Sequence, residues 1–398
     1  MKILVMNSGS SSLKYQIFNI ENSFDILAKG LVERIGLKGS KITHQPTGKD
    51  NVVIEKDLTD HKAAMEEIEP LLTDSDYGVI DNMSEINGIG HRVVHGGEYF
   101  NHSVVITKEM IDKMKELSKF APLHNPPNIL GIETCMSLLD VPNVAVFDTA
   151  VHQTMPKKAY MYGLPLEYYK KDGIRKYGFH GTSHDYVSRE TAKVLGKPFE
   201  QCKIIVCHLG NGSSITAFKN GKVMDTSMGL TPLEGLVMGT RCGDIDPAAI
   251  LWIMGEYNLS PKEMDDILNK KSGLLGLGGS SDLRDVLASA KKGDKDADAA
   301  VEILIYRIQK YIGSYLASLN GADAVVFTAG IGENNSFIRE RVLECFEFAG
   351  IKVDKNKNEN KETIFSTGDS KIKAMMLPTD EEYMIAKDTY TLITGKDI

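Results

Sequence analysis

Two segments rich in glycine, serine and asparagine could bind the phosphate groups of a nucleotide. They are Asn7–Ser12 and His208–Ser214, and each lies between two apolar segments that are typical of strands. Glycine lets the backbone turn sharply, so successive N–H groups and hydroxyls can converge on an anion. Two such loops, about 200 residues apart in a chain of 398 residues, predict two related halves that face each other across one polyphosphate.

The chain lacks a Walker P-loop, but a third glycine-rich segment indicates a nucleotide site of another type. Each Gly-Lys pair lacks the glycine five residues upstream that a Walker P-loop needs, which excludes that class; the pairs begin at Gly48, Gly196, Gly221 and Gly395. The segment Thr328–Asn335 follows a strand at 324–327 and precedes a helix that we expect Ser336 to cap. This order would bring the backbone close to a flat ligand.

Two arginines are candidates for binding anions. Arg92 lies on a predicted strand just before Gly96 and offers a planar fork for a carboxylate or phosphate, although an arginine on a strand is also a common salt-bridge partner. Arg241 stands between Gly239 and Gly243, which favours a side chain aimed at a ligand over one lying on a surface; both interpretations stay open.

Three further side chains could act in the same chemistry. His180 precedes a predicted helix, whose positive dipole end favours anions and disfavours an imidazolium. Asp148 follows the strand 144–146, where α/β proteins usually place acidic site residues, although chance also puts acids there. Near the C-terminus Thr379 and Glu382 form a predicted capping box, which leaves Glu381 as the candidate for a Mg²⁺ site.

Some of these residues also allow plainer interpretations. His180 and His184 are four residues apart, but no glutamate follows the first as a zinc protease helix requires, which argues against a metal role. His184 is then a capping or core histidine.

Composition limits the class of protein. The formal charge of −8 and the absence of long Lys/Arg runs argue against nucleic acid as a partner. The five cysteines are scattered without a C-x-x-C pair, which indicates reduced thiols and neither a zinc site nor a disulfide framework. No apolar run approaches the length of a membrane span, and no signal peptide precedes Asn7. We therefore expect a soluble cytoplasmic protein.

Strands and amphipathic helices mix in both halves, which predicts an α/β fold of roughly two domains. Ser260 should cap a helix that runs to about Lys270, and apolar residues at helical spacing mark a long helix across 301–319. Asn220-Gly221 predicts a hairpin turn. Residues 37–60 are mixed and polar, which predicts excursions of the chain over the surface, outside the sheet. The domain junction should lie between Pro142 and Pro156.

Taken in order, the motifs resemble those of the acetate kinase family. The resemblance covers essentially the whole chain and is carried by Asn7–Lys14, His91–Gly97, Pro122–Pro126, Phe147–Ala150, Tyr177–His184, His208–Ser214, Gly330–Asn334 and Thr379–Glu382. One departure is Asp380, where the family commonly has asparagine, and it adds charge beside Glu381.

Membership would imply two duplicated actin-like, ribonuclease H-like ATPase domains with ATP in the cleft between them. We expect residues 1–150 to form the first domain, completed by a C-terminal helix at about 380–398, and residues 151–379 to form the nucleotide-binding domain. The resemblance also implies a homodimer. The implied reaction is reversible, direct in-line transfer of the γ-phosphoryl group of ATP to acetate, which gives acetyl phosphate and ADP with Mg²⁺, or Mn²⁺ in its place.

The resemblance also implies roles for individual residues. Arg92 and Arg241 would hold the carboxylate and the phosphoryl oxygens, His180 would donate to the transition state, and Asp148 would orient the reacting groups. Asn7 and Glu381 would position Mg²⁺. The acetate methyl pocket would comprise Val94, Leu123, Phe179 and Pro232. The residues expected around the nucleotide are Lys14, His208, Leu209, Gly210, Asn211, Gly212, Asp282, Leu283, Arg284, Gly330, Ile331, Gly332, Glu333 and Asn334.

Two other functions remain open at this point. A small apolar pocket discriminates against one extra methylene by only about 1–3 kcal/mol, so a kinase for propionate or other short-chain acids is the nearest alternative. A protein of the actin type could instead bind ATP as a non-catalytic switch. That protein would form no acyl phosphate.

Overall fold

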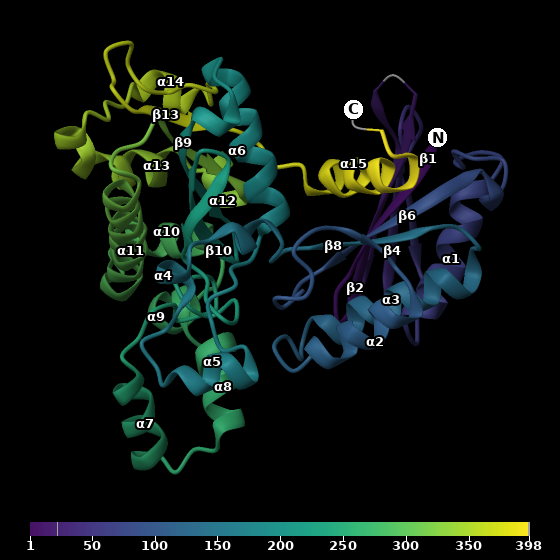
Figure 1. Cartoon of the computed structure of the whole chain (residues 1–398), viewed down its shortest axis with the longest axis horizontal. Coiled ribbons are helices and arrows are strands. Elements are labelled where there is room, and N and C mark those ends of the chain that lie inside the picture. The colour runs from purple at the N-terminus through teal and green to yellow at the C-terminus, as the bar shows by residue number, and fades with distance from the viewer. Residues whose placement is uncertain (22, 397–398) are drawn as a thin grey trace. The chain divides into compact units, whose positions relative to one another are not determined.

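The computed structural model describes residues 1–21 and 23–396, which divide into two compact units (Figure 1). Unit 1 contains Met1–Ala150 together with Asp380–Ile398, and unit 2 contains Val151–Thr379. Each unit has its own mixed sheet and hydrophobic core. Among the described residues, no helix has the length and apolarity that a membrane crossing requires.

Unit 1 is built on an eight-stranded sheet with the order β5-β4-β3-β2-β1-β6-β8-β7. The strands are β1 (Lys2–Ser8), β2 (Ser12–Ile20), β3 (Phe24–Glu33), β4 (Lys41–Pro46), β5 (Val52–Glu55), β6 (Ile86–Val93), β7 (Val104–Val105) and β8 (Asn143–Phe147). The prediction of surface excursions at residues 37–60 was wrong, because β4 and β5 extend the sheet there. Ile42 and His44 of β4 are buried, and their alternation with half-buried Thr43 marks a strand with one face toward the core.

Helices cover both faces of this sheet, so the central strand β1 is apolar on both sides. Leu4 and Met6 pack in the cluster that includes Ala64 and Ile68 of α1, whereas Ile3 and Val5 pack with Ile385 of α15. The helices of unit 1 are α1 (His61–Thr73), α2 (Lys108–Leu117), α3 (Asn125–Leu138) and α15 (Glu381–Thr394), with the short 3₁₀ segment Met83–Glu85. The C-terminal helix α15 therefore belongs to the same core as the N-terminal strand.

Unit 2 repeats the strand plan of unit 1. Its sheet has the order β11-β10-β9-β12-β13, and its strands are β9 (Lys203–Leu209), β10 (Ser213–Lys219), β11 (Lys222–Thr226), β12 (Ala324–Thr328) and β13 (Lys373–Met376). Three antiparallel strands joined by short turns are followed by two parallel strands, as in β3-β2-β1-β6-β8. The prediction of two related halves is confirmed at this level.

The helices of unit 2 confirm the clearest predictions from the sequence. The helix α8 begins after a Ser260–Glu263 capping box and ends at Lys270, and α11 spans the predicted long apolar stripe. The complete set is α4 (Lys157–Tyr160), α5 (Leu166–Asp172), α6 (Gly181–Leu195), α7 (Pro247–Glu256), α8 (Pro261–Lys270), α9 (Gly273–Gly278), α10 (Leu283–Lys291), α11 (Lys295–Leu319), α12 (Ala329–Asn334), α13 (Ser336–Leu343) and α14 (Lys355–Glu359), with 3₁₀ segments at Val151–Thr154, Phe199–Gln201 and Glu344–Ala349.

The predicted turn was right, but two predicted caps were wrong. Asn220 and Gly221 both have positive φ, at 56° and 75°, and form the hairpin between β10 and β11. The cap of α13 is Asn335, which accepts from the N–H of Ile338, and not Ser336. Likewise Asp380 caps α15 by accepting from the N–H of Tyr383, so Thr379 and Glu382 form no capping box there.

Acidification should destabilise unit 1 through His91. This side chain is buried between β6 and β8 and donates from Nε2 to Oδ1 of Asn143 at 2.7 Å, and burial lowers the pKa of His91 to about 4. The unfolded chain, with an ordinary histidine pKa of about 6.5, binds the proton first as the pH falls. The free energy of unfolding should therefore drop by about 2 kcal/mol between pH 7.5 and pH 5 on account of this residue.

Urea unfolding of His91→Gln measures that contribution. The amide N–H of glutamine can still donate to Asn143 but does not titrate, so the decline between the two pH values should be smaller by about 2 kcal/mol. An equal decline in the variant and the wild type would contradict this account.

Candidate active site

In unit 1 the loop between β1 and β2 is held from two sides. The N–H of Gly9 donates to the carbonyl of Ser12 at 2.8 Å, and His61 of α1 donates from Nε2 to the carbonyl of Gly9 at 2.7 Å. A Cβ on Gly131 would overlap the hydroxyl of Ser8, so α3 reaches the loop only because this position is glycine. The loop is therefore a fixed platform of backbone N–H groups and serine hydroxyls.

Two asparagines of α3 fix the neighbouring strand end. Asn128 accepts from the N–H of Val94 at 3.1 Å and donates to the carbonyl of Ser8 at 2.6 Å. Asn125 accepts from the N–H of His95 at 3.0 Å and donates to its carbonyl at 2.9 Å. Since both amides are buried and satisfied on each side, they hold the segment after Arg92 in place.

Arg92, which is partly buried, and Asp148, which is buried, form a bidentate ion pair in unit 1. Nε of Arg92 donates to one oxygen of Asp148 at 3.0 Å, and Nη2 donates to the other at 2.7 Å. Glu381 lies 3.8 Å from Nε on a third side. Burial alone would lower the pKa of Arg92, but the carboxylates of Asp148 and Glu381 raise it above its usual value. The structure therefore brings Arg92, Asp148 and Glu381 together, and the roles expected for them stay predictions.

Negative charge around Glu381 is only partly compensated. Burial raises the pKa of Glu381 to about 7, and the carboxylates of Asp148 and Glu382 add to that rise, while Arg92 and Lys14 oppose it. Asn7 and Lys14 are partners across β1 and β2, so both predicted metal residues and Lys14 lie in unit 1. The carboxylate of Glu381 and the side-chain amide of Asn7 both offer hard oxygen donors, which suit Mg²⁺.

In unit 2 the second phosphate-type loop is equally fixed. The N–H of Gly210 donates to the carbonyl of Gly212 at 3.1 Å and to the hydroxyl of Ser213 at 3.2 Å. The N–H of Gly239 donates to the carbonyl of Asn211 at 3.0 Å, and a Cβ on Gly239 would overlap the Asn211 amide. The loop therefore depends on a glycine from a segment about 28 residues downstream.

His180 and Arg241 converge on this loop. His180 is the N-cap of α6 and has a left-handed backbone, with φ of 55°, which is uncommon for a residue other than glycine. A Cβ built on Gly212 would lie 3.4 Å from both Nε2 of His180 and Nη1 of Arg241. Nη1 also donates to the carbonyl of Pro232 at 3.2 Å, and burial lowers the pKa of Arg241. The structure thus brings together three residues that the sequence placed far apart.

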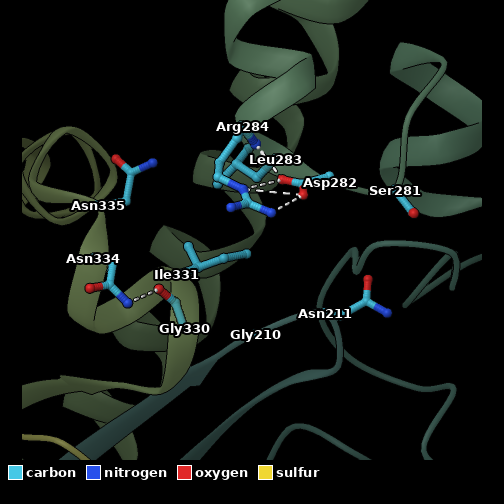
Figure 2. Close-up of a pocket in the computed structure, with 10 residues that line it drawn as sticks. All are labelled: Gly210, Asn211, Ser281, Asp282, Leu283, Arg284, Gly330, Ile331, Asn334 and Asn335. Atoms are coloured by element: carbon cyan, nitrogen blue, oxygen red, sulfur yellow. Dashed lines mark hydrogen bonds and ion pairs between the residues drawn. The ribbon is translucent and has the colours of Figure 1, made fainter. Parts of the chain in front are cut away.

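A cavity of about 540 Å³ opens beside the loop (Figure 2). In Figure 2, Leu283 and Arg284 lie on one wall with Ile331 below them, and Asn211 projects from a separate loop. Arg284 is turned back onto Asp282, whose carboxylate accepts from Nε at 3.0 Å. The lining residues are Gly210, Asn211, Ser281, Asp282, Leu283, Arg284, Gly330, Ile331, Asn334 and Asn335. Eight of these were expected around a nucleotide from the sequence; Ser281 and Asn335 were not.

The glycine-rich segment after β12 is a short helix, α12, rather than the loop that was expected. It is held by Arg339, whose fully buried guanidinium donates to the carbonyls of Gly332 and Glu333 at 2.8 and 3.0 Å and to Asn358. The carboxylate of Glu333 accepts from the N–H of Ala329 at 2.8 Å. Arg339 therefore fixes the pocket wall from behind.

The four residues predicted for an apolar pocket are divided between the units. Val94 and Leu123 belong to unit 1, where Val94 is buried and Leu123 is 53% exposed. Phe179 and Pro232 belong to unit 2, where Phe179 is buried and Pro232 accepts from Arg241. Their joint role stays a prediction.

Several residues that shape the site were not singled out from the sequence. They are Asn125, Asn128, Ser214 and Arg339, whose partners are distant in the chain. Asn125 stands inside a motif that was recognised, and Ser214 ends the second glycine loop, so a signal existed for both. Nothing in the sequence around Asn128 or Arg339 predicts which backbone groups they bind.

Comparison with known proteins places this geometry in context. Residues 2–387 match the model of the acetokinase family. The chain is 55% identical to the acetate kinase of Natranaerobius thermophilus over 397 residues, which cover 99% of this chain and 100% of that protein. It is also 55% identical to the acetate kinase of Thermotoga maritima over 400 residues, which cover 99% of each.

Solved structures of kinases for short-chain acids also match this chain over nearly its whole length. The crystal structure of Porphyromonas gingivalis acetate kinase matches with a TM-score of 0.93 at 46% identity and covers 99% of this chain and 100% of that one. A propionate kinase from Francisella tularensis matches with a TM-score of 0.93 at 44% identity and covers 98% of this chain and 99% of that one. The predicted α/β class with actin-like domains is confirmed by these matches and by the two mixed sheets.

Proposed function

Because this chain belongs to the acetokinase family, we propose that it transfers the γ-phosphoryl group of ATP to acetate, reversibly, and forms acetyl phosphate and ADP. The prediction of a kinase with a carboxylate acceptor is confirmed by the family and by the names of these relatives. The observation that carries the proposal is the convergence of His180 and Arg241 on the loop at Gly212, beside the cavity that Figure 2 shows.

The chemistry makes modest demands on acid and base catalysis. Acetate is already an anion at neutral pH, so no residue needs to remove a proton from it. The difficulty is to bring a carboxylate against a γ-phosphate and to stabilise the charge of the transferring group. Asp148 is engaged with Arg92 through both oxygens, which suits an orienting role better than that of a base.

We assign the cations and donors as follows. Arg92 would bind the carboxylate of acetate, since its planar fork is already oriented by Asp148. Arg241 and His180 would bind the phosphoryl oxygens and stabilise the transition state. Because Arg241 bonds only neutral acceptors, the carbonyl of Pro232 and the sulfur of Met238, among the interactions known for it, its charge is available to an anion.

The cavity of Figure 2 would hold the nucleoside. The guanidinium of Arg284 and the side chains of Leu283 and Ile331 present flat or apolar surfaces that suit the adenine ring. The loop His208–Gly212 and Lys14 would contact the phosphates.

Mg²⁺, or Mn²⁺ in its place, would neutralise charge on the phosphates, and Asn7 and Glu381 are the residues of this chain that would hold it. The described residues contain no group of three or more His, Cys, Asp or Glu side chains placed to bind a metal ion. A metal held through water and substrate phosphates needs only one or two carboxylates, which fits this set.

Propionate remains the closest competing acceptor. A structural relative at 44% identity is described as a propionate kinase, and one methylene changes the free energy of binding by only about 1–3 kcal/mol. We propose that acetate is the preferred substrate and that propionate reacts more slowly.

An exposed apolar helix supports the expected homodimer. The described residues of α7 (Pro247–Glu256) include none that is buried, and Leu251 and Trp252 are 70% and 64% exposed. Ile245 and Tyr257 extend the apolar surface beyond both ends of the helix. Exposed apolar side chains grouped in one segment are typical of a subunit interface, and we propose that a second copy of the chain covers them.

The thiols fit a reducing compartment. All five cysteines are free, and three of them are buried as small apolar side chains: Cys135, Cys202 and Cys207. Burial raises the pKa of the Cys135 thiol to about 12, so it is unreactive. We propose a cytoplasmic location, where ATP is available.

Trapping with hydroxylamine tests the reaction. With ATP, Mg²⁺ and acetate the protein should form acetyl hydroxamate, with kcat/KM highest for acetate in the series formate, acetate, propionate and butyrate. Arg241→Ala should lower kcat by about 100-fold or more, because its partner is the transition state. ATP binding without hydroxamate would identify a nucleotide switch instead, and an optimum at propionate would identify the competing kinase.

Gly212→Ala should reduce activity without unfolding the protein. The φ of Gly212 lies outside the left-handed region, and the added methyl would lie 3.4 Å from Nε2 of His180 and Nη1 of Arg241, in the space assigned to the phosphoryl group. We expect kcat/KM for ATP to fall by about tenfold or more with an unchanged melting temperature. Gly368→Ala is the matched control, because a Cβ there has no atom within 4 Å and the residue lies outside the candidate site. Equal activity of both variants would contradict the assignment.

Trp252 gives a direct probe of the dimer, since it is the single tryptophan of the chain. Trp252→Glu should convert the dimer to a monomer in sedimentation equilibrium, because a charge in an apolar interface is costly. In the wild type, dilution should shift Trp252 fluorescence to the red. A monomeric wild type at micromolar concentration would rule out this interface, and an unperturbed dimer of the variant would place it elsewhere.

A further inference from the structure

A hydrogen-bonded cluster of histidines and hydroxyls lies behind His180 in unit 2. The hydroxyl of Ser214 is 2.9 Å from Nδ1 of His180 and 2.7 Å from Nε2 of His184. Ser214 and His184 are fully buried, and neither was assigned a role in binding or transfer. Ser214 lies on β10 and His184 on α6, so the contact ties the cap of α6 to the sheet.

The protons in this cluster can be placed by elimination. Burial, and then His152 and His208, hold the pKa of His184 well below its usual value, so its ring is neutral and carries one N–H. Nδ1 of His184 has no hydrogen-bond partner among the described residues. An orphaned buried N–H is rarer than an orphaned acceptor, so the proton belongs on Nε2, where Ser214 can accept it.

Ser214 has a single hydroxyl proton, and accepting from His184 leaves that proton for His180. We propose that His184 and Ser214 act as a relay that fixes the tautomer of His180, with Nε2–H of His184 donating to Ser214 and the Ser214 hydroxyl donating to Nδ1 of His180. Nε2 of His180 then carries the N–H, and Nε2 is the ring nitrogen that lies beside Gly212 and Arg241. This inference rests on the proposed role of that space in phosphoryl transfer.

The opposite tautomer would oppose the reaction. With the proton on Nδ1, His180 would donate to Ser214 and turn the lone pair of Nε2 toward the phosphoryl oxygens. A lone pair facing an anion repels it, whereas an N–H donor held in place stabilises the charge that develops in the transition state. A relay of neutral groups also provides this donor at the N-terminus of α6, where an imidazolium is disfavoured.

Ser183 and His208 form a second pair of a hydroxyl and an imidazole next to the first, and this pair is consistent with the proposed relay. Ser183 lies 2.8 Å from Nδ1 of His208 and accepts from the hydroxyl of Thr379 at 2.7 Å. The rings of His180 and His208 are stacked with centroids 4.2 Å apart. Two charged imidazoles at this distance would repel each other, so neutral rings with serine hydroxyls at both Nδ1 atoms are the favourable arrangement.

Nitrogen NMR of protein labelled with ¹⁵N-histidine reads the tautomer directly, without substrate. The His180 signals are assigned by their loss in His180→Gln. The wild type should show Nε2 of His180 protonated and Nδ1 unprotonated, and Ser214→Ala should give a mixture of tautomers. A wild-type His180 protonated at Nδ1, or a spectrum unchanged in Ser214→Ala, would overturn the relay.

Kinetics test its consequence for the reaction. Ser214→Ala should lower kcat by about tenfold or more while KM for ATP changes less than about twofold. His184→Gln should keep most of the activity that His184→Leu loses, because the glutamine Nε2–H can also donate to Ser214. Thr216→Val is the matched control, since Thr216 is a buried hydroxyl two residues along β10 that bonds Thr226. An equal loss of kcat in Ser214→Ala and Thr216→Val would show that the effect comes from packing and would contradict the relay.

These readouts separate the two proposals. If the wild type forms no acetyl hydroxamate but His180 shows the predicted tautomer, the relay stands and the reaction does not. If hydroxamate forms and the tautomer is wrong, the reaction stands and the relay fails.

Discussion

A guanidinium removed from water is unfavourable unless another group compensates its charge. Three arginines, of which Arg339 is fully buried and Arg92 and Arg241 are partly buried, meet that constraint in different ways. Arg92 is paired with Asp148 through both of its oxygens, and its pKa is raised. Arg339 bonds only backbone carbonyls and an amide, and burial lowers its pKa to about 10. Arg241 also bonds only neutral acceptors among its known contacts. Unlike Arg339, Arg241 places its Nη1 beside the loop at Gly212, which suits the role that we propose for it in binding the phosphoryl group.

Fixed backbone positions complement these charges. His180 and Ala329 both have left-handed backbones, with φ of 55° and 64°, and each begins a helix next to a glycine-rich segment. A non-glycine residue in this region costs of order 1–3 kcal/mol, so surrounding contacts must over-determine it. Ser214 supplies one such contact at the His180 ring, and the carboxylate of Glu333 supplies another at the N–H of Ala329. Two of the left-handed non-glycine residues of the described chain therefore stand at the candidate site.

The sequence predicted those features whose causes are local. Glycine turns, the Ser260 capping box and the apolar stripe of α11 depend on residues within one or two turns of each other, and the structure confirms them. The predictions failed where two local solutions compete. Asn335 and Ser336 are both good caps, and packing selects the first. Residues 41–55 are polar enough for a surface loop, yet β3 offers them a sheet edge to pair with.

The candidate site was predictable where chemistry restricts the residue type, and unpredictable where a contact spans the chain. Charged side chains next to glycines or at the end of a strand are easily recognised, so Arg92, Asp148 and Arg241 could be selected from the sequence. Ser214 lies at the end of a recognised loop, but the contacts of its hydroxyl could not be predicted, because they depend on the pairing of β9 with β10 and on the position of α6. A serine hydroxyl can either donate or accept a hydrogen bond. In the proposed relay, the direction of the bond between Ser214 and His180 follows from the lack of a partner at Nδ1 of His184. The residues that order a site are thus harder to identify than those that face its ligand, because their chemistry is defined by their neighbours.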